Sequence, residues 1–473
     1  MENSKLLLLL KTFSATELRA FKDFVESPYF NKNEELIRLN AYLKKQAAKG
    51  FPGTKLQRKA VYAAVYPGES YDEKKLNYAL SLLLKLAERF VAIQGFENWG
   101  IVPDYQVLTT YSERHLPKNY DYIFQQASAN VEVLPYRNDD YYFQHYLLAD
   151  VADAHFSAKN ERRFDPALQQ AADCFDIYYM AKKLRFLCNM LDRQKFISTK
   201  YNLYYIDEIK MMLTKRDWSA VPPIAVYYQL LLLLTEKEPL IYFNNFRQLL
   251  KAYIQLFPLA EARELYRFAI NFYIQQIRVG EKQFAQDLMA LYREGIDNQV
   301  LLEKGQLSPW TFKNMVKLGL GLRQYDWVEQ FVTEFSAKLD ADKRQDAYHF
   351  NLADLYYHKK DLTKTLFHLN QVEFSDISYH IGAKSMLLKI YYETPETEAF
   401  LSLIATFRVF LQRNKSVPKE VKMPYLNFVN LLHELFRHGK TRWDTLREKI
   451  EQTPMLTERS WLKEQLEKLK PQR

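Results

Sequence analysis

Apolar residues recur at helical spacing along the chain, and short polar segments separate the apolar runs. One clear case follows Ser14, which forms a capping box with Glu17 three residues later. Behind this box, Leu18, Phe21 and Phe24 are spaced three residues apart, which places them on one side of a helix. The pattern therefore predicts a helix over residues 15 to 26.

Proline pairs mark further helix boundaries. A proline keeps the residue before it out of the helical region, yet it is tolerated in the first helical turn, where its missing N–H is not needed. The pairs are Ser27-Pro28, Asp165-Pro166 and Ser308-Pro309. The first ends a helix, and the other two begin one because Asp and Ser are good N-cap acceptors. Helical runs of about 12 to 25 residues joined by short polar links are typical of antiparallel helix pairs.

Glycine is scarce, which disfavours β-rich and nucleotide-binding folds. The chain has 473 residues but only 12 glycines, and none lies from Ile101 through Val279. Tight hairpins and phosphate-binding loops need glycine because it adopts positive φ angles without steric cost. The predicted fold class is therefore all-α, with helix in more than about 65% of residues against a base rate of roughly one third.

The C-terminal half carries an internal repeat. Met315, Tyr325, Val328 and Val332 are followed 37 residues later by Leu352, Leu362, Thr365 and Leu369, and 36 residues after those by Leu388, Glu398, Leu401 and Ala405. This period, with two helices per unit, resembles the tetratricopeptide repeat (TPR). The match is best at 309–412, where Leu352, Ala353 and Tyr356 fit the TPR signature; Thr365 and Lys389 depart from it. The alternative is a set of irregular helical hairpins with coincidental spacing.

The resemblance implies a right-handed α-α solenoid behind a small N-terminal helical domain. Because a single core stops growing beyond roughly 250 to 300 residues, we expect three parts. Residues 1–100 form the N-terminal helical domain, 101–300 an irregular helical-hairpin solenoid, and 301–473 a TPR-like solenoid with C-terminal capping helices.

The N-terminal part suggests a different motif. The segment from Arg58 to Arg89 is similar to the helix-turn-helix of winged-helix bacterial activators, because a helix ending in Tyr66 and Pro67 precedes a longer, leucine-rich helix. Residues 95–102 offer no convincing wing hairpin. The nearby run at 27–31, Ser-Pro-Tyr-Phe-Asn, resembles uncharacterised helical proteins of Bacteroidota, a resemblance that implies no activity.

A basic cluster flanks this motif. The net charge is +9, and one stretch of sixteen residues holds six basic residues and no acidic one. These residues are Lys44, Lys45, Lys49, Lys55, Arg58 and Lys59. They form either a solvated surface or a contact with a nucleic-acid backbone or another anionic partner, since clustered cations gain free energy by releasing counterions.

Two further observations concern location. The cysteines Cys174 and Cys188 lie fourteen residues apart on one expected helix, which favours buried thiols over a disulfide framework. The apolar runs 6–10 and 224–234 are too short for a signal peptide or a membrane helix. We therefore expect a cytoplasmic protein that does not insert into a membrane.

Motifs for catalysis or cofactor binding are incomplete. Gly439, Lys440 and Thr441 imitate the end of a P-loop, but Glu434 occupies the position of the required glycine. His433 and His438 are five residues apart, whereas a zinc-binding helix needs a spacing of four. We expect no catalytic residues, no cofactor and no metal site, and hence no enzyme.

The leading hypothesis is a protein-protein interaction scaffold that binds a peptide or helix of a partner in a concave groove. The TPR register selects groove residues Trp310, Lys313, Lys317, Phe350, Asp354 and Tyr357, with Met386 and Ile390 from the third repeat. Because a second basic set is missing, the expected ligand is partly apolar. Trp310 is alternatively a core residue.

A DNA-binding transcriptional regulator is the second hypothesis. It would use the helix-turn-helix-like segment, with Lys74, Lys75, Asn77 and Ser81 as candidate base readers. An enzyme without a recognisable motif is the third.

Overall fold

The computed structural model describes residues 3–158, 164–194, 200–341, 344–372, 377–414, 419–439 and 441–470. Helix accounts for 77% of the structure, and the described residues form 23 α-helices. Strands within these residues are confined to one hairpin, β1 (Leu302–Glu303) and β2 (Gln306–Leu307). The predicted all-α class and helical content are confirmed.

The chain divides into two units, Met1–Phe257 and Pro258–Arg473. Residues 6–90 share one hydrophobic core within the first unit. The three-part division at residues 100 and 300 stays a prediction.

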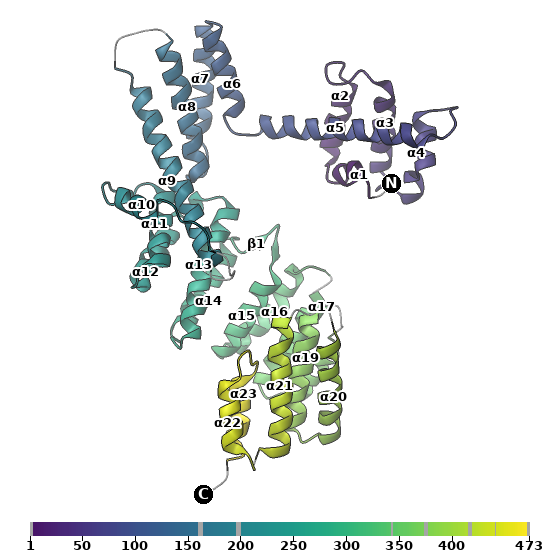
Figure 1. Ribbon diagram of the computed structural model, residues 1–473, viewed down its shortest axis with the longest axis vertical. Coiled ribbons are helices and arrows are strands. Elements are labelled where there is room, and N and C mark those ends of the chain that lie inside the picture. The colour runs from purple at the N-terminus through teal and green to yellow at the C-terminus, as the bar shows by residue number, and fades with distance from the viewer. Residues whose placement is uncertain are drawn as a thin grey trace. The chain divides into compact units, whose positions relative to one another are not determined.

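Five helices build the N-terminal core of the first unit. They are α1 (Lys5–Leu10), α2 (Ala15–Glu26), α3 (Glu34–Ala47), α4 (Arg58–Val65) and α5 (Glu73–Glu97), with a 3-10 turn at Gly53–Leu56. Each of α1 to α4 packs against α5 (Figure 1). The predicted capping box is present: the Glu17 carboxylate accepts from the Ser14 amide at 2.7 Å, and the Ser14 hydroxyl oxygen accepts from the Glu17 amide at 3.2 Å. Local chemistry thus sets the start of α2.

Seven further helices complete the first unit. They are α6 (Val102–Glu113), α7 (Pro117–Glu132), α8 (Asp139–Ser157), α9 (Pro166–Gln194), α10 (Ile206–Leu213), α11 (Pro222–Thr235) and α12 (Pro239–Tyr253). The helix start predicted at Asp165 is confirmed, because its carboxylate accepts from the Ala167 amide at 2.9 Å. Helix α9 packs against α8 and α11. Cys188 on α9 is fully buried, and burial raises the pKa of its thiol.

The second unit contains eleven α-helices among its described residues. They are α13 (Leu259–Arg278), α14 (Phe284–Asp297), α15 (Pro309–Gly321), α16 (Tyr325–Phe335), α17 (Arg344–His358), α18 (Leu362–Leu369), α19 (Ile377–Glu393), α20 (Thr397–Arg413), α21 (Lys419–His438), α22 (Trp443–Gln452) and α23 (Arg459–Lys468). From α15 to α22, each helix packs against the next, and α15, α17, α19 and α21 also contact one another in sequence. Helix α15 begins behind Ser308, as predicted, although the Ser308 side chain makes no capping bond.

The repeat register is correct for two copies and shifts in the third. Val328 and Thr365 are fully buried at equivalent positions of α16 and α18, as predicted. In α20, however, Phe400 is fully buried, whereas the predicted equivalent Leu401 is 37% exposed. The reason is that α19 ends 35 residues after the end of α17, not the 36 that the sequence register predicts. A link of three residues then connects α19 to α20. The second helix of the third pair therefore starts earlier than the sequence spacing indicates.

None of the described helices combines the length and the apolar character that crossing a bilayer requires.

Candidate functional site

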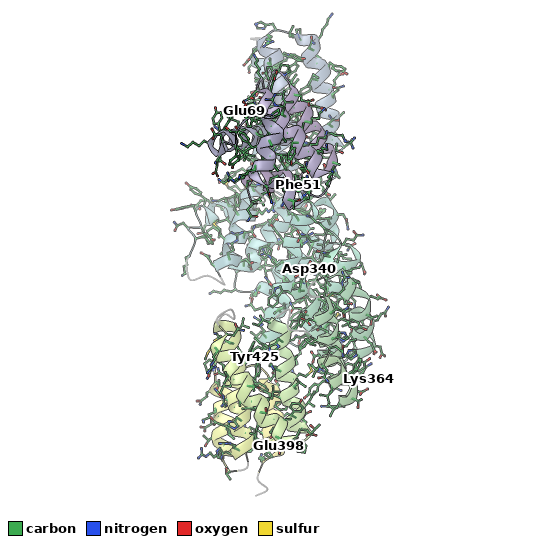
Figure 2. All side chains as sticks on the ribbon, turned by 90° about the vertical axis from the view of Figure 1, so that its right-hand side faces the viewer. Phe51, Glu69, Asp340, Lys364, Glu398 and Tyr425 are labelled. Carbon is green, nitrogen blue, oxygen red and sulfur yellow. The ribbon has the colours of Figure 1, made fainter. Side chains whose placement is uncertain are left out.

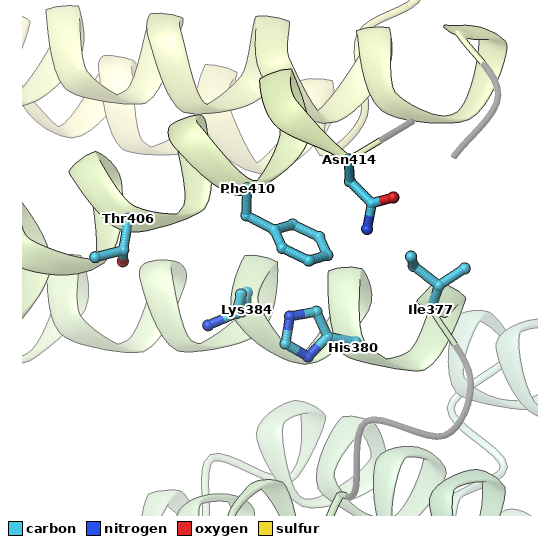
Figure 3. A pocket seen from close by; sticks show the side chains of 6 residues that line it. All are labelled: Ile377, His380, Lys384, Thr406, Phe410 and Asn414. Carbon is cyan, nitrogen blue, oxygen red and sulfur yellow. The ribbon is translucent and has the colours of Figure 1, made fainter. Parts of the chain in front are cut away.

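A pocket of about 430 Å³ opens between α19 and α20. Ile377, His380 and Lys384 line it from α19, at spacings of three and four residues that place them on one helix face. The other wall is a similar row at spacings of four along α20 and its C-cap, consisting of Thr406, Phe410 and Asn414. Figure 3 shows these side chains facing one another across the pocket. Each wall is thus one face of a helix.

Apolar groups form much of the pocket wall. The ring centres of His380 and Phe410 lie 4.8 Å apart, and Ile377 is the first residue of α19. The Thr406 hydroxyl donates to the carbonyl oxygen of Ser402 at 3.0 Å. The pocket therefore offers a hydrophobic surface with a few polar groups at its edges, which is the usual composition of a ligand site.

Lys384 gives the pocket its charge. Burial lowers the pKa of the Lys384 ammonium, while burial and the Lys384 charge lower the pKa of His380 to about 4; Asp346 opposes the second shift. His380 is therefore neutral at pH 7. Among the described residues, Lys384 makes no ion pair and no side-chain hydrogen bond. An uncompensated cation beside apolar surface suits a ligand with an acidic group on an apolar body.

The first half of the predicted groove lies on α15. Trp310 in its first turn is 72% exposed, so the alternative that Trp310 is a core residue is wrong. Lys317 is exposed and Lys313 is half-buried. Their role in partner binding stays a prediction.

The second half of the predicted groove is largely closed, which corrects the expectation that it forms an open surface. Phe350 and Tyr357 on α17 are only 6% and 5% exposed, and Met386 and Ile390 on α19 are buried as well. Phe350 packs so tightly on Gly382 of α19 that a Cβ there would lie 2.8 Å from its ring. Asp354 is half-buried beside His358 and raises the pKa of that imidazole.

The chain's own C-terminal helix covers this part of the groove. The Lys389 ammonium on α19 pairs with the carboxylate of Glu458 at 2.9 Å and lies 4.7 Å from the centre of the Tyr357 ring. Glu393 accepts from the Tyr357 hydroxyl at 2.9 Å and from the Trp461 indole N–H at 2.8 Å. These bonds join α17, α19 and α23 where the TPR register predicts an open face.

The N-terminal basic cluster is mostly exposed. Lys44 is half-buried, and the other five members are exposed. Arg58 is engaged at the surface, because its guanidinium donates to Glu73 and Asn77, each at 2.8 Å. The five lysines make no ion pair with any described residue. The lysine side chains are therefore not neutralised by ion pairs within the described part of the chain.

The candidate base readers on α5 are engaged within the protein. The Lys75 ammonium donates to Glu69 (labelled in Figure 2) at 2.8 Å and lies 4.0 Å from the centre of the Tyr66 ring. The Ser81 hydroxyl donates to the carbonyl oxygen of Asn77 at 2.9 Å. With the Asn77 side chain accepting from Arg58, three of the four readers make side-chain bonds within the protein, which leaves less of this helix for reading bases.

The incomplete P-loop and zinc motifs lie at the C-terminal end of α21. His433 and Gly439 lie on or just after α21, and the Gly439 amide donates to the carbonyl oxygen of Leu435 at 2.9 Å, continuing the helical pattern. Lys440 lies outside the described residues. Within the described part of the chain, no group of three or more His, Cys, Asp or Glu side chains is arranged to hold a metal ion.

Sequence reasoning missed the α19–α20 pocket. Its residues do show helical spacing, but the same spacing occurs on every packed helix face, so it does not distinguish a pocket wall from a core. Lys389 offered a clearer signal for a different contact, since a lysine at a position that the TPR register reserves for a small buried residue requires a counter-charge. That counter-charge is Glu458, which is partly exposed.

Comparison of the chain with protein-family models, with curated proteins and with solved structures found no match.

Proposed function

We propose that the protein is a helical-repeat scaffold that binds a segment of a partner protein through its second unit, with the α19–α20 pocket as the anchor point. The partner segment presents an apolar side chain next to an acidic one. The apolar group packs on Phe410 and Ile377, and the carboxylate pairs with Lys384. The observation that carries the proposal is the Lys384 ammonium, which is partly buried in a pocket without an ion-pair partner among the described residues.

The arrangement of the second unit supports a solenoid as the scaffold. Helices α15, α17, α19 and α21 contact one another in sequence, while α16, α18 and α20 each pack between successive members of that row. Stacked helix pairs of this kind create extended binding surfaces. Since α23 covers the face near Tyr357, the proposal places the ligand in the pocket between α19 and α20, which is larger than the pocket of about 210 Å³ beside Trp327.

Peptide arrays test this proposal with the full chain. Arrays that pair Asp or Glu with Leu, Phe or Met should retain the protein, and Lys384→Met should reduce binding at least about tenfold, because the carboxylate loses its counter-charge. Lys364→Met is the matched control, since Lys364 is an exposed lysine of the neighbouring α18. Equal binding by both variants, with unchanged melting temperatures, would refute the pocket as the anchor.

A second candidate function is contact with a nucleic-acid backbone through the five lysines of the basic cluster. Their lack of ion pairs among the described residues favours it. Four phosphate contacts would give a slope near −3 to −4 in a plot of log affinity against log salt. Charge reversal at Lys44, Lys45, Lys55 and Lys59 should flatten that slope, and absence of DNA binding by the full chain at low salt would remove this candidate.

A further inference from the structure

Helix α9 is apolar on two opposite faces. One face is buried against neighbouring helices and includes Ile177, Met180 and Leu184. The opposite face is exposed, yet it carries Leu168, Phe175, Tyr179 and Phe186, which are 60%, 47%, 42% and 55% exposed. Large apolar side chains repeated along one exposed helix face mark an interaction surface rather than an ordinary solvated face.

The exposed face follows a coiled-coil spacing. Adding two smaller or polar members gives a row separated by four, three, four, three and four residues: Leu168, Ala172, Phe175, Tyr179, Lys182 and Phe186. We call this row the α9 seam. Alternating spacings of four and three define the contact line of two helices that pack along their length. The seam therefore fits another long helix.

Charges on α9 indicate which helix packs on the seam. Asp176 flanks the seam in the N-terminal half of α9, and Lys183 flanks it on the same side in the C-terminal half. Lys182 and Arg185, also in the C-terminal half, lie within ion-pair distance of Asp139 on α8. A second α9 in the antiparallel direction brings the acidic half of each helix beside the basic half of the other. A parallel second copy would place like charges together, which is unfavourable.

The sizes of the seam residues fix the register of such a pair. With the two-fold axis at residue 177, Leu168 faces Phe186, Phe175 faces Tyr179, and Ala172 faces Lys182. The long Lys182 side chain thus meets the smallest residue of the seam, while its ammonium keeps the 2.7 Å bond to Asp139 of its own chain.

We infer that the protein forms a two-fold symmetric dimer in which the α9 seams of two copies pack antiparallel. The contact is isologous, so the same residues serve on both sides and the assembly closes at two copies. This inference concerns the first unit and is independent of the peptide-binding proposal for the second.

Sedimentation equilibrium of the full chain between about 1 and 100 µM tests the dimer, since this range brackets the dissociation constants of ordinary specific pairs. Phe186→Asp places a charge in the seam twice per dimer and should weaken association at least about 100-fold. Tyr122→Asp on α7 is the matched control, because Tyr122 is 60% exposed outside the seam and its change should leave association intact. A monomer throughout the range, or equal effects of the two variants, would overturn the inference.

A charge exchange tests the antiparallel direction. Lys183→Glu and Asp176→Lys should each weaken self-association, because each places like charges across the seam. Mixing the two variants should restore dimers, since both cross-seam pairs are then of opposite charge. If the mixture stays as weak as its components while both variants melt like the natural chain, the antiparallel pairing is wrong.

Discussion

The ion pair between Lys389 and Glu458 gives a prediction with an unusual asymmetry. The Lys389 side chain is only 8% exposed, whereas that of Glu458 is 33% exposed. Removing the more exposed partner should therefore cost more than removing the buried one, because it leaves an ammonium in the interior. The variants that test this are Glu458→Gln and Lys389→Met, both of similar size to the natural residues.

The magnitudes follow from the surroundings. Breaking a buried pair by removing one partner costs roughly 3 to 5 kcal/mol. The Tyr357 ring near Lys389 and the carbonyl oxygen of a glutamine at 458 offset part of this, so we expect about 2 kcal/mol for Glu458→Gln. For Lys389→Met we expect less than about 1 kcal/mol, since water can hydrate the remaining carboxylate and the thioether side chain packs in the interior.

Hydrogen exchange of the full chain is the suitable assay because it reports opening of α23 alone. A loss of 2 kcal/mol corresponds to roughly 30-fold faster exchange of the amides at 459–468. Amides of α2, in the other unit, are the internal control and should not change. Exchange that is accelerated equally by the two variants, or more by Lys389→Met, would refute the reasoning.

Four further predictions concern single residues. Trp310→Ala should change the free energy of unfolding by less than about 0.5 kcal/mol, because Trp310 is exposed; a larger loss in urea titration would contradict this. Gly382→Ala should destabilise by about 1 kcal/mol, as contact with Phe350 outweighs the better helix propensity. At Gly95 a Cβ meets no atom within 4 Å, so Gly95→Ala should stabilise by about 0.5 kcal/mol. Calorimetry of the two glycine variants measures both changes in stability. Because the pKa of His380 is lowered to about 4, the unfolded state takes up a proton at a higher pH than the folded state, so stability should fall from pH 6.5 toward pH 4. If the free energy of unfolding depends on pH with the same slope in His380→Asn, His380 is not the cause.

Helix starts were readable from the sequence because they depend on contacts within one turn. Ser14 and Asp165 both accept from backbone amides two or three residues ahead, and each begins a helix where predicted. Ser308 also precedes a helix, although its side chain makes no capping bond. Proline at the first position suffices there, since it needs no N–H partner.

Closure of the predicted groove could not be read from the sequence, because it depends on a segment far along the chain. The TPR register predicts that Phe350 and Tyr357 line an open groove, but it contains no information about what packs on them, and both are buried. Their burial depends on Gly382 and on residues near 458, brought together by tertiary structure. The third repeat shows the same limit, since one helix end moved the buried position to Phe400.

The long separation between Lys389 and Glu458 has a consequence for the order of events during synthesis. The two residues are 69 positions apart in the chain. At about 5 to 20 residues per second, the ribosome adds Glu458 roughly 3 to 14 s after Lys389. Throughout that interval the lysine has no Glu458 carboxylate to bury itself against, so α17 and α19 stay open to water or to a chaperone. The contact of α17 and α19 with α23 can therefore form only after α23 has left the ribosome.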